Sequence, residues 1–293
     1  MTDRRGARGF LVLLLKVAAA WLTMVMVLAL LERSFIYFPV RHPGGDWGFP
    51  DRAAVQGLRV EDRFFPTEDG LRLHAWWCLP AANPNPEALP VLLVFHGNAG
   101  NIAHRGDLLA EFAALPARVL LMDYRGYGRS EGRPSEAGLQ RDARAAWRHL
   151  TVQHSIPAEQ ITVLGKSLGG AVAVLLAAEV RPAGLVVQSS FTSLPDVAVR
   201  VFPFVPRRFI RTRFDAREAM PRVRCPILVL HSQADEVVPF DLGRRLFEAA
   251  PQPKHFVDLT PARHNDPHLV VPDLYFRALG AFLTSLAEKP PTP

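Results

Sequence analysis

Short apolar segments that alternate with helix-forming segments constrain the fold of this chain more than any other feature. The strand candidates occupy residues 58–65, 71–79, 91–97, 118–124, 161–167, 184–190, 226–232 and 254–260. From the third strand onward, helix candidates separate them at about residues 102–114, 136–153, 168–180, 240–250 and 272–287. This alternation predicts an α/β fold, in which a mostly parallel sheet carries helices on both faces. The first two segments predict an antiparallel hairpin at the start of the sheet.

One connection is much longer than the others. The segment between Ser190 and Pro226 is rich in Phe, Pro and Arg. Long connections at the carboxyl edge of a parallel sheet are usually functional, so we expect a small helical cap over that edge at residues 191–225. The alternative is a single crossover helix with a decorated loop.

The segment ITVLGKSLGGAVAVLLAAEV, residues 161–180, changes from a β-branched run to a helix former at Ser167. Gly165 and Gly169 flank this serine. A sharp strand-to-helix turn would expose the Ser167 hydroxyl as a nucleophile, and side chains at the flanking positions would collide across the turn. The N–H of Leu168, at the start of the helix, is then a candidate oxyanion donor. The alternative is an ordinary strand–turn–helix with an incidental serine.

A serine nucleophile needs a base, and the base needs an orienting carboxylate. In this strand order both partners should follow Ser167 along the chain, first the acid and then the histidine, each just after a strand. Asp235 and His264 lie at these two places. The fallback candidates are the acids Glu236 and Asp266 and the base His268.

A second oxyanion donor is expected in the loop after the strand at residues 91–97. The sequence there is HGNAGNIAHR, and the backbone N–H of Asn98 is the candidate. Asn101 is a candidate helix N-cap in the same loop. His96 and His104 have no third ligand at metal-binding spacing, so we expect no metal.

Five motifs carry a family resemblance. HGNAGN, DYRGYGRSEG, GKSLGG, HSQADEVVP and HND occur in this order between residues 96 and 266. With them the chain resembles the α/β-hydrolase superfamily over roughly residues 58–288, and more narrowly its single-pass, membrane-anchored serine hydrolases. The resemblance implies an eight-stranded, mostly parallel sheet and a catalytic triad of Ser167, Asp235 and His264 that works without a cofactor.

The resemblance also implies an activity. Related proteins act as esterases, lysophospholipases or protein-lipid thioesterases, so the expected substrate is a small-molecule acyl ester or thioester. Two positions depart from the usual pattern, Ser232 where relatives usually have glycine and Lys166 where they usually have an uncharged residue. Lys166 either favours an anionic substrate or faces solvent. The alternative functions are a serine peptidase of the same fold and a catalytically silent, membrane-tethered binding module.

An apolar segment near the amino terminus predicts a membrane anchor. Residues 10–31 contain only Lys16 and Thr23 as polar interruptions, and a helix of this length reaches about 33 Å, enough to span a bilayer. The alternative is a cleaved secretory signal, with AAA at residues 18–20 as the cleavage region. An uncleaved anchor makes the lipid bilayer a partner of this protein.

The flanking charges predict the orientation of this anchor. The amino-terminal side of the segment carries more basic residues, Arg4, Arg5, Arg8 and Lys16, than the other side, Arg33 and Arg41. By the positive-inside rule, the amino terminus is cytoplasmic and the catalytic domain lies across the membrane.

These features divide the chain into four parts. The predicted parts are an anchor at 1–31, a juxtamembrane strap at 32–57 with Trp and Tyr at the membrane interface, a hydrolase domain at 58–288 and a tail at 289–293. The net charge of +6 is compatible with a nucleic-acid partner, but the basic residues are scattered and no motif for binding DNA or RNA accompanies them. We therefore expect no nucleic-acid partner.

Overall fold

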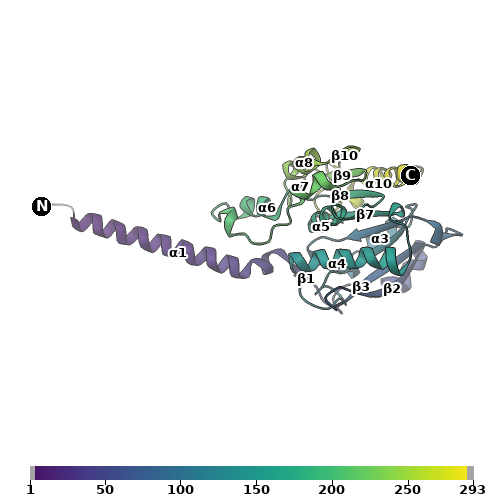
Figure 1. Ribbon diagram of the computed structural model, residues 1–293, viewed down its shortest axis with the longest axis horizontal. Helices are drawn as coiled ribbons and strands as arrows, with labels where there is room; N and C mark the ends of the chain where they lie inside the picture. Colours follow the sequence, from purple (N-terminus) through teal and green to yellow (C-terminus); the bar gives the residue numbers. More distant parts are fainter. Residues whose placement is uncertain (1–3, 289–293) are drawn as a thin grey trace.

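The computed structural model describes residues 4–288, so the predicted tail at 289–293 lies outside the described residues. A long helix leads into an α/β domain (Figure 1). The helices are α1 (Arg4–Ile36), α2 (Phe49–Arg52), α3 (Gly106–Phe112), α4 (Glu136–Arg148), α5 (Leu168–Ala177), α6 (Leu194–Val201), α7 (Ala216–Ala219), α8 (Phe240–Ala249), α9 (Pro267–Val270) and α10 (Pro272–Ala287). The strands are β1 (Phe38–Pro39), β2 (Leu58–Pro66), β3 (Arg72–Pro80), β4 (Val91–Phe95), β5 (Ala99–Gly100), β6 (Arg118–Met122), β7 (Ile161–Lys166), β8 (Gly184–Gln188), β9 (Ile227–His231) and β10 (Lys254–Asp258).

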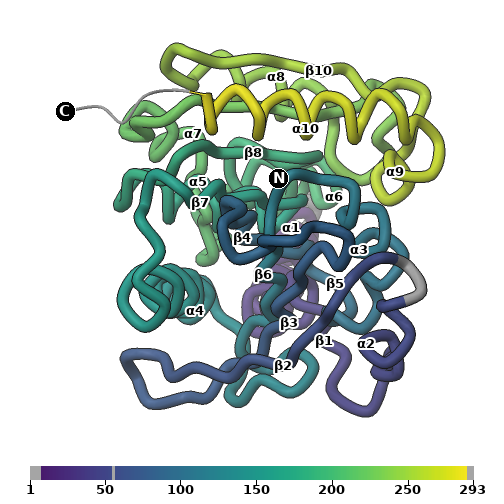
Figure 2. The backbone as a smooth tube through the Cα atoms, turned by 90° about the vertical axis from the view of Figure 1, so that its right-hand side faces the viewer, coloured from purple at the N-terminus to yellow at the C-terminus, as the bar shows by residue number. Residues whose placement is uncertain are grey.

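The main sheet has eight strands in the order β10-β9-β8-β7-β4-β6-β3-β2. The strands from β10 to β6 are parallel, whereas β3 pairs antiparallel with both β2 and β6. Figure 2 shows this order, with α4 and α5 on one side of the sheet and α2 and α3 on the other. The predicted α/β fold with a mostly parallel, eight-stranded sheet is confirmed.

The buried strands explain why helices cover both faces. In β4, Val91, Leu93 and Phe95 belong to the core beneath α4, α5 and α8, whereas Leu92 and Val94 belong to the core beneath α3 and α10. Because successive side chains of a strand point to opposite faces, a continuous apolar run is buried on both sides. β7 lies at the middle of this sheet, so the turn that follows it is anchored in rigid structure.

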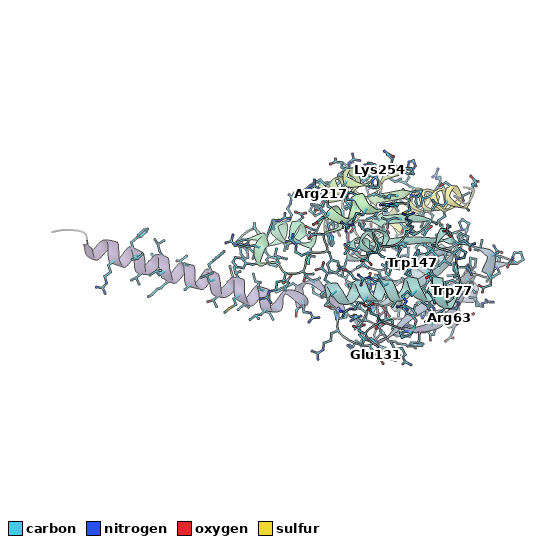
Figure 3. The ribbon with its side chains drawn as sticks, in the orientation of Figure 1. Arg63, Trp77, Glu131, Trp147, Arg217 and Lys254 are labelled. Atoms are coloured by element: carbon cyan, nitrogen blue, oxygen red, sulfur yellow. The ribbon has the colours of Figure 1, made fainter. Side chains whose placement is uncertain are left out.

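α1 runs away from the domain (Figure 1). Its segment Arg8–Ile36 is long and apolar enough to cross a membrane by length and composition, and little of it is buried. Its side chains from residue 8 to residue 20 are exposed, and Figure 3 shows this part of the helix away from the domain.

The strap after α1 is bound to the loop that follows β4. β1 pairs parallel with β5, and the Asn101 amide donates to the carbonyls of Val40 and Gly44. This side chain thus holds the strap instead of capping a helix. Tyr37 is buried and Trp47 packs edge-to-face on Trp76. The expectation that these aromatic side chains lie at the membrane interface is wrong, because the domain supplies their apolar contacts.

The long connection after β8 has two parts with different surroundings. α6 and the short 3-10 helix Arg207–Phe209 lie beside α1, whereas α7 packs against α5 and α8 with buried Ala216, Ala219 and Met220. We call residues 194–212 the cap. It is shorter than the predicted insertion at 191–225, because α7 completes the helical layer over the sheet.

Candidate active site

Ser167 lies at a strained turn between β7 and α5, which we call the elbow. Its φ and ψ are 54° and −118°, in the region of positive φ that side chains rarely adopt. A Cβ on Gly165 would lie 2.0 Å from the carbonyl oxygen of Gly169, and one on Gly169 would lie 2.1 Å from that of Phe95. The two arms of the turn are therefore in backbone contact with each other, and the start of α5 is in backbone contact with the end of β4, so only glycine fits at both positions.

Two neighbours hold the turn in this conformation. The Ser167 N–H donates to the Gln188 carbonyl at 2.8 Å, and the Ser190 hydroxyl donates to the Ser167 carbonyl at 2.8 Å. Both partners lie at the end of β8 or just after it. The adjacent strand thus stabilises the strained backbone while leaving the Ser167 side chain free of these contacts.

His264 and Asp235 form a buried hydrogen-bonded pair. His264 follows β10 and Asp235 follows β9, so the carboxyl ends of adjacent strands bring them together. Nδ1 of His264 lies 2.9 Å from Oδ1 and 2.8 Å from Oδ2 of Asp235. A carboxylate in this position fixes the imidazole with Nδ1–H toward the acid, which leaves Nε2 as the basic nitrogen.

The Asp235 carboxylate is also held by its own turn. Its Oδ1 accepts the N–H groups of Val237 and Val238 at 2.9 and 2.8 Å. Burial raises the pKa of this carboxyl, but hydrogen bonds from His231, His264 and the Val238 amide outweigh it and hold the pKa well below its ordinary value. The acid is therefore ionised at neutral pH, as the orienting member of a proton relay must be.

Ser167, His264 and Asn98 line one pocket of about 510 Å³ at the carboxyl edge of the sheet. The Leu168 N–H begins α5 directly after the serine. The Asn98 peptide is fixed, because its carbonyl accepts the Phe38 N–H at 3.1 Å and the Tyr127 hydroxyl at 2.8 Å. Three of the predicted site residues, Ser167, His264 and Asn98, thus line the same pocket, and Leu168 follows Ser167 directly in the chain.

The fallback candidates make other contacts. The Glu236 carboxylate accepts the backbone N–H of His264 at 3.2 Å, and Asp266 accepts the N–H of Arg263 at 2.6 Å. His268 lies in α9. Asp235 is the acid that contacts the His264 imidazole.

The pocket is basic. Lys166, His104 and Arg105 line it together with Ser167. The Lys166 ammonium donates to the side-chain oxygen of Asn265 at 2.9 Å. Burial, together with repulsion from Arg105, lowers the pKa of Lys166 to about 8, although Asp235, Asp266 and Glu236 oppose this shift. Lys166 is therefore a pocket residue that still carries its charge at neutral pH.

Within residues 4–288, no group of three His, Cys, Asp or Glu side chains is arranged to hold a metal ion. The polar groups around Ser167 are those of acid–base chemistry and anion binding. Their arrangement supports nucleophilic attack by the serine hydroxyl, with proton transfer to an oriented imidazole.

Comparison with known proteins places the chain in a family. Residues 90–220 match the alpha/beta hydrolase fold family. The alpha/beta hydrolase domain-containing protein WAV2 of Arabidopsis thaliana is 32% identical, over 90% of this chain and 91% of its own length. The chain belongs to the α/β-hydrolase family.

Other proteins are also similar to this chain. The protein bem46 of Schizosaccharomyces pombe is 36% identical over 80% of this chain and 79% of its own length. The uncharacterized protein Rv2307c of Mycobacterium tuberculosis is 38% identical over 87% of this chain and 88% of its own length. Among solved structures, an esterase of Pyrococcus furiosus matches with a TM-score of 0.68 at 19% identity, covering 86% of this chain and 98% of that one. The esterase domain of a Rhodothermus marinus protein matches with a TM-score of 0.57 at 25% identity, covering 76% of this chain and 97% of that one.

Several pocket residues of this α/β hydrolase were not predicted as site residues, among them Val40, His104 and Arg105. Val40 comes from the strap, and His104 and Arg105 come from the helical turn after the HGNAGN loop. Val40 has no chemical signature, because it reaches the pocket only through the pairing of β1 with β5. The sequence contained only a weak indication that Arg105 lines the pocket. It lies seven positions after Asn98, in the loop expected at the carboxyl edge of the sheet near the candidate nucleophile.

Ser232, which stands where relatives usually have glycine, makes hydrogen bonds within its turn. The Ser232 hydroxyl accepts the Ala234 N–H at 3.0 Å and lies 3.4 Å from the Thr260 hydroxyl. A serine at this position thus supports the turn that presents Asp235.

Proposed function

We propose that this α/β hydrolase is a membrane-anchored serine hydrolase that cleaves carboxylic ester or thioester bonds of acyl substrates. The observation that carries the proposal is one pocket lined by Ser167 and by a His264 imidazole hydrogen-bonded to Asp235. The esterases among the structural matches and the apolar helix α1 support it.

The proposed reaction proceeds through an acyl-enzyme. Nε2 of His264 accepts the Ser167 hydroxyl proton while Oγ attacks the acyl carbonyl, and the Leu168 and Asn98 amides stabilise the oxyanion. The tetrahedral intermediate expels the alcohol or thiol, which takes the proton from His264. Water then attacks the acyl-serine, gives a proton to His264 and releases the carboxylic acid, with that proton returning to Ser167.

The anchor determines where this reaction occurs. With α1 in the bilayer and the basic residues of its amino-terminal flank in the cytoplasm, the catalytic domain lies on the opposite side. The membrane then supplies acyl substrates at high local concentration. Attaching a glycosylation or protease-cleavage tag to each end of the chain tests this orientation.

A substrate panel tests the activity. The full-length protein in detergent or nanodiscs is offered nitrophenyl esters, acyl thioesters, lysophospholipids and peptide anilides, with a fluorophosphonate probe to report serine reactivity. We expect probe labelling at Ser167 and turnover of esters or thioesters. Preferred cleavage of the anilides would identify a peptidase instead, and absent labelling with folded protein would identify a binding module.

Replacing Asp235 with asparagine should lower kcat by about 10³–10⁴-fold. An amide in place of the carboxylate no longer stabilises the protonated His264 and favours the wrong tautomer. Glu236→Gln is the matched control, because that carboxylate contacts only the backbone N–H of His264 among the triad residues. We expect the control to retain activity within about tenfold. Steady-state kinetics on one nitrophenyl ester measures both, and equal losses would contradict the assigned acid.

The charge of Lys166 should determine a pH-dependent substrate preference. Since its pKa is about 8, the side chain is cationic at pH 7 and largely neutral at pH 9. The kcat/KM for an anionic acyl ester, divided by that for a neutral ester of equal chain length, should fall about fivefold between these pH values. Taking the ratio cancels the titration of the shared catalytic groups. Lys166→Gln should have a low ratio at both pH values, and an unchanged pH dependence in this variant would contradict the assignment.

A further inference from the structure

An apolar groove of about 310 Å³ separates α1 from the cap. One wall is the carboxyl-terminal third of α1, including Val25, Ala29 and Ile36, and the other is the cap, including Val197, Ala198 and Val205. Figure 1 shows α6 beside this part of α1. We call this space the anchor–cap groove. Its size is at the lower end of the range for small-molecule sites.

Specific contacts hold the cap against α1. The Trp21 indole N–H donates to the Phe204 carbonyl at 3.2 Å, and its ring packs edge-to-face on Phe209. At the other end of the groove, the Glu32 carboxylate accepts the N–H groups of Arg211 and Thr212 at 3.2 and 2.7 Å. These contacts fix the cap against α1 at both ends of the groove.

With α1 spanning the bilayer, part of the cap would lie at the depth of the hydrocarbon core, because the cap contacts α1 at Trp21. The hydrocarbon core needs about 20 helical residues, so a span that begins at Arg8 ends near residue 27. Trp21 then lies about 9 Å below the edge of the hydrocarbon. Phe204, bonded to Trp21, lies at the same depth, and Val201 and Phe204 are exposed in the described structure. Exposed apolar side chains at this depth would contact lipid.

Both walls of the groove are connected to residues that line or support the catalytic pocket. The Ile36 carbonyl, at the end of α1, accepts the side-chain amide of Asn98, which lines that pocket. On the other side, α6 begins four residues after Ser190, whose hydroxyl donates to the Ser167 carbonyl. Each wall of the groove is thus connected through a short stretch of chain to a residue that hydrogen-bonds Asn98 or Ser167.

We propose that the anchor–cap groove binds the acyl chain of a membrane lipid and directs its carbonyl toward Ser167. This inference rests on the proposed function and adds that the substrate is a lipid taken from the leaflet in which the cap lies. The occupant follows from the chemistry of the groove, whose lining is apolar except for Glu32, a carboxylate already bound by two backbone amides. α1 supplies one wall, so the membrane anchor is also part of the substrate site.

Groove-filling substitutions test this site by chain length. Ala29→Phe and Ala198→Phe place a ring in the groove from opposite walls. We expect each to lower kcat/KM for a palmitoyl ester by about tenfold or more, with less than about twofold change for the acetyl ester, since only the long chain needs the groove. Ala20→Phe, on an exposed part of α1 outside the groove, is the matched control and should leave both values unchanged. Unchanged palmitoyl turnover in both groove variants, or equal loss of both substrates, would overturn the proposal.

A binding experiment separates this proposal from the proposed activity. The full-length Ser167→Ala protein in nanodiscs is irradiated with a phospholipid that carries a diazirine in its acyl chain, and the crosslinked peptides are mapped by mass spectrometry. We expect crosslinks on residues 25–36 and 194–210 that Ala29→Phe removes and Ala20→Phe retains. Crosslinks in the groove with no ester turnover by the wild-type protein would refute the hydrolase function and retain the lipid site. Crosslinks confined to the amino-terminal half of α1 would refute the lipid site alone.

Discussion

Replacing Ser167 with alanine should abolish fluorophosphonate labelling and lower ester turnover by about 10⁴–10⁶-fold. The hydroxyl is the group that would form the acyl-enzyme, and the remaining oxyanion donors give only weak catalysis without it. Alanine keeps the Cβ, so the strained φ of 54° and the contacts of the turn are the same in the variant. The unfolding temperature should therefore change little.

The measurement is kcat/KM on one nitrophenyl ester, with the full-length protein in the same detergent for every variant. Ser285→Ala is a suitable control, because within residues 4–288 this hydroxyl bonds only to the Phe282 carbonyl on α10. We expect it to retain wild-type turnover and labelling. If Ser167→Ala remains labelled and active, another residue is the nucleophile and the proposed mechanism is wrong.

Replacing Gly169 with alanine should strongly destabilise the fold of the site. The added Cβ would lie 2.1 Å from the Phe95 carbonyl oxygen and 2.5 Å from that of His96, both backbone atoms at the end of the central strand β4. Neither can move as a side chain would, so the elbow must shift. We expect a loss of about 3 kcal/mol of stability, or a fall of about 6–12 °C in unfolding temperature, and loss of turnover with it.

Gly280→Ala is the matched control for this substitution. Gly280 lies within α10, and a Cβ there would have its nearest neighbour, a Leu115 methyl, at 3.9 Å. Alanine in a helix interior is favoured over glycine by about 1 kcal/mol, so this variant should be as stable as the wild type or slightly more stable. Circular dichroism during heating measures both. Equal unfolding temperatures for the two variants would show that the elbow is not tightly packed.

Element positions were predictable because they depend on local pattern. The helix predicted at 272–287 is α10 with the same bounds, and the strand predicted at 184–190 is β8, which ends at Gln188. The strand ends there because Ser189, whose N–H still donates to the Leu230 carbonyl at 2.8 Å, has a φ of 47° and the chain turns. The helix predicted at 102–114 shortens to α3, since Asp123 binds the Ile102 N–H and a 3-10 turn precedes the helix.

The strap and the cap were less predictable because their partners are distant in sequence. Tyr37 and Trp47 are amphipathic residues that suit either a membrane interface or a protein core. Their burial depends on the pairing of β1 with β5, some 60 positions away along the chain. Likewise, α6 and α7 come from one Phe- and Ala-bearing connection, and only the surroundings distinguish the helix beside α1 from the one over the sheet.

The sequence by itself determined the α/β fold, the glycine–serine–glycine elbow and the order of its acid and base candidates, because these depend on periodicity and on steric rules that act over a few residues. The tertiary structure decided that Asp235 rather than Glu236 contacts the His264 imidazole, that Lys166 and Arg105 line the pocket, and that the anchor and cap enclose an apolar groove. Such contacts join segments far apart along the chain, so their geometry depends on how the strands stack and where the long connections return. The sequence pattern alone does not show how close two such distant segments lie in the folded protein.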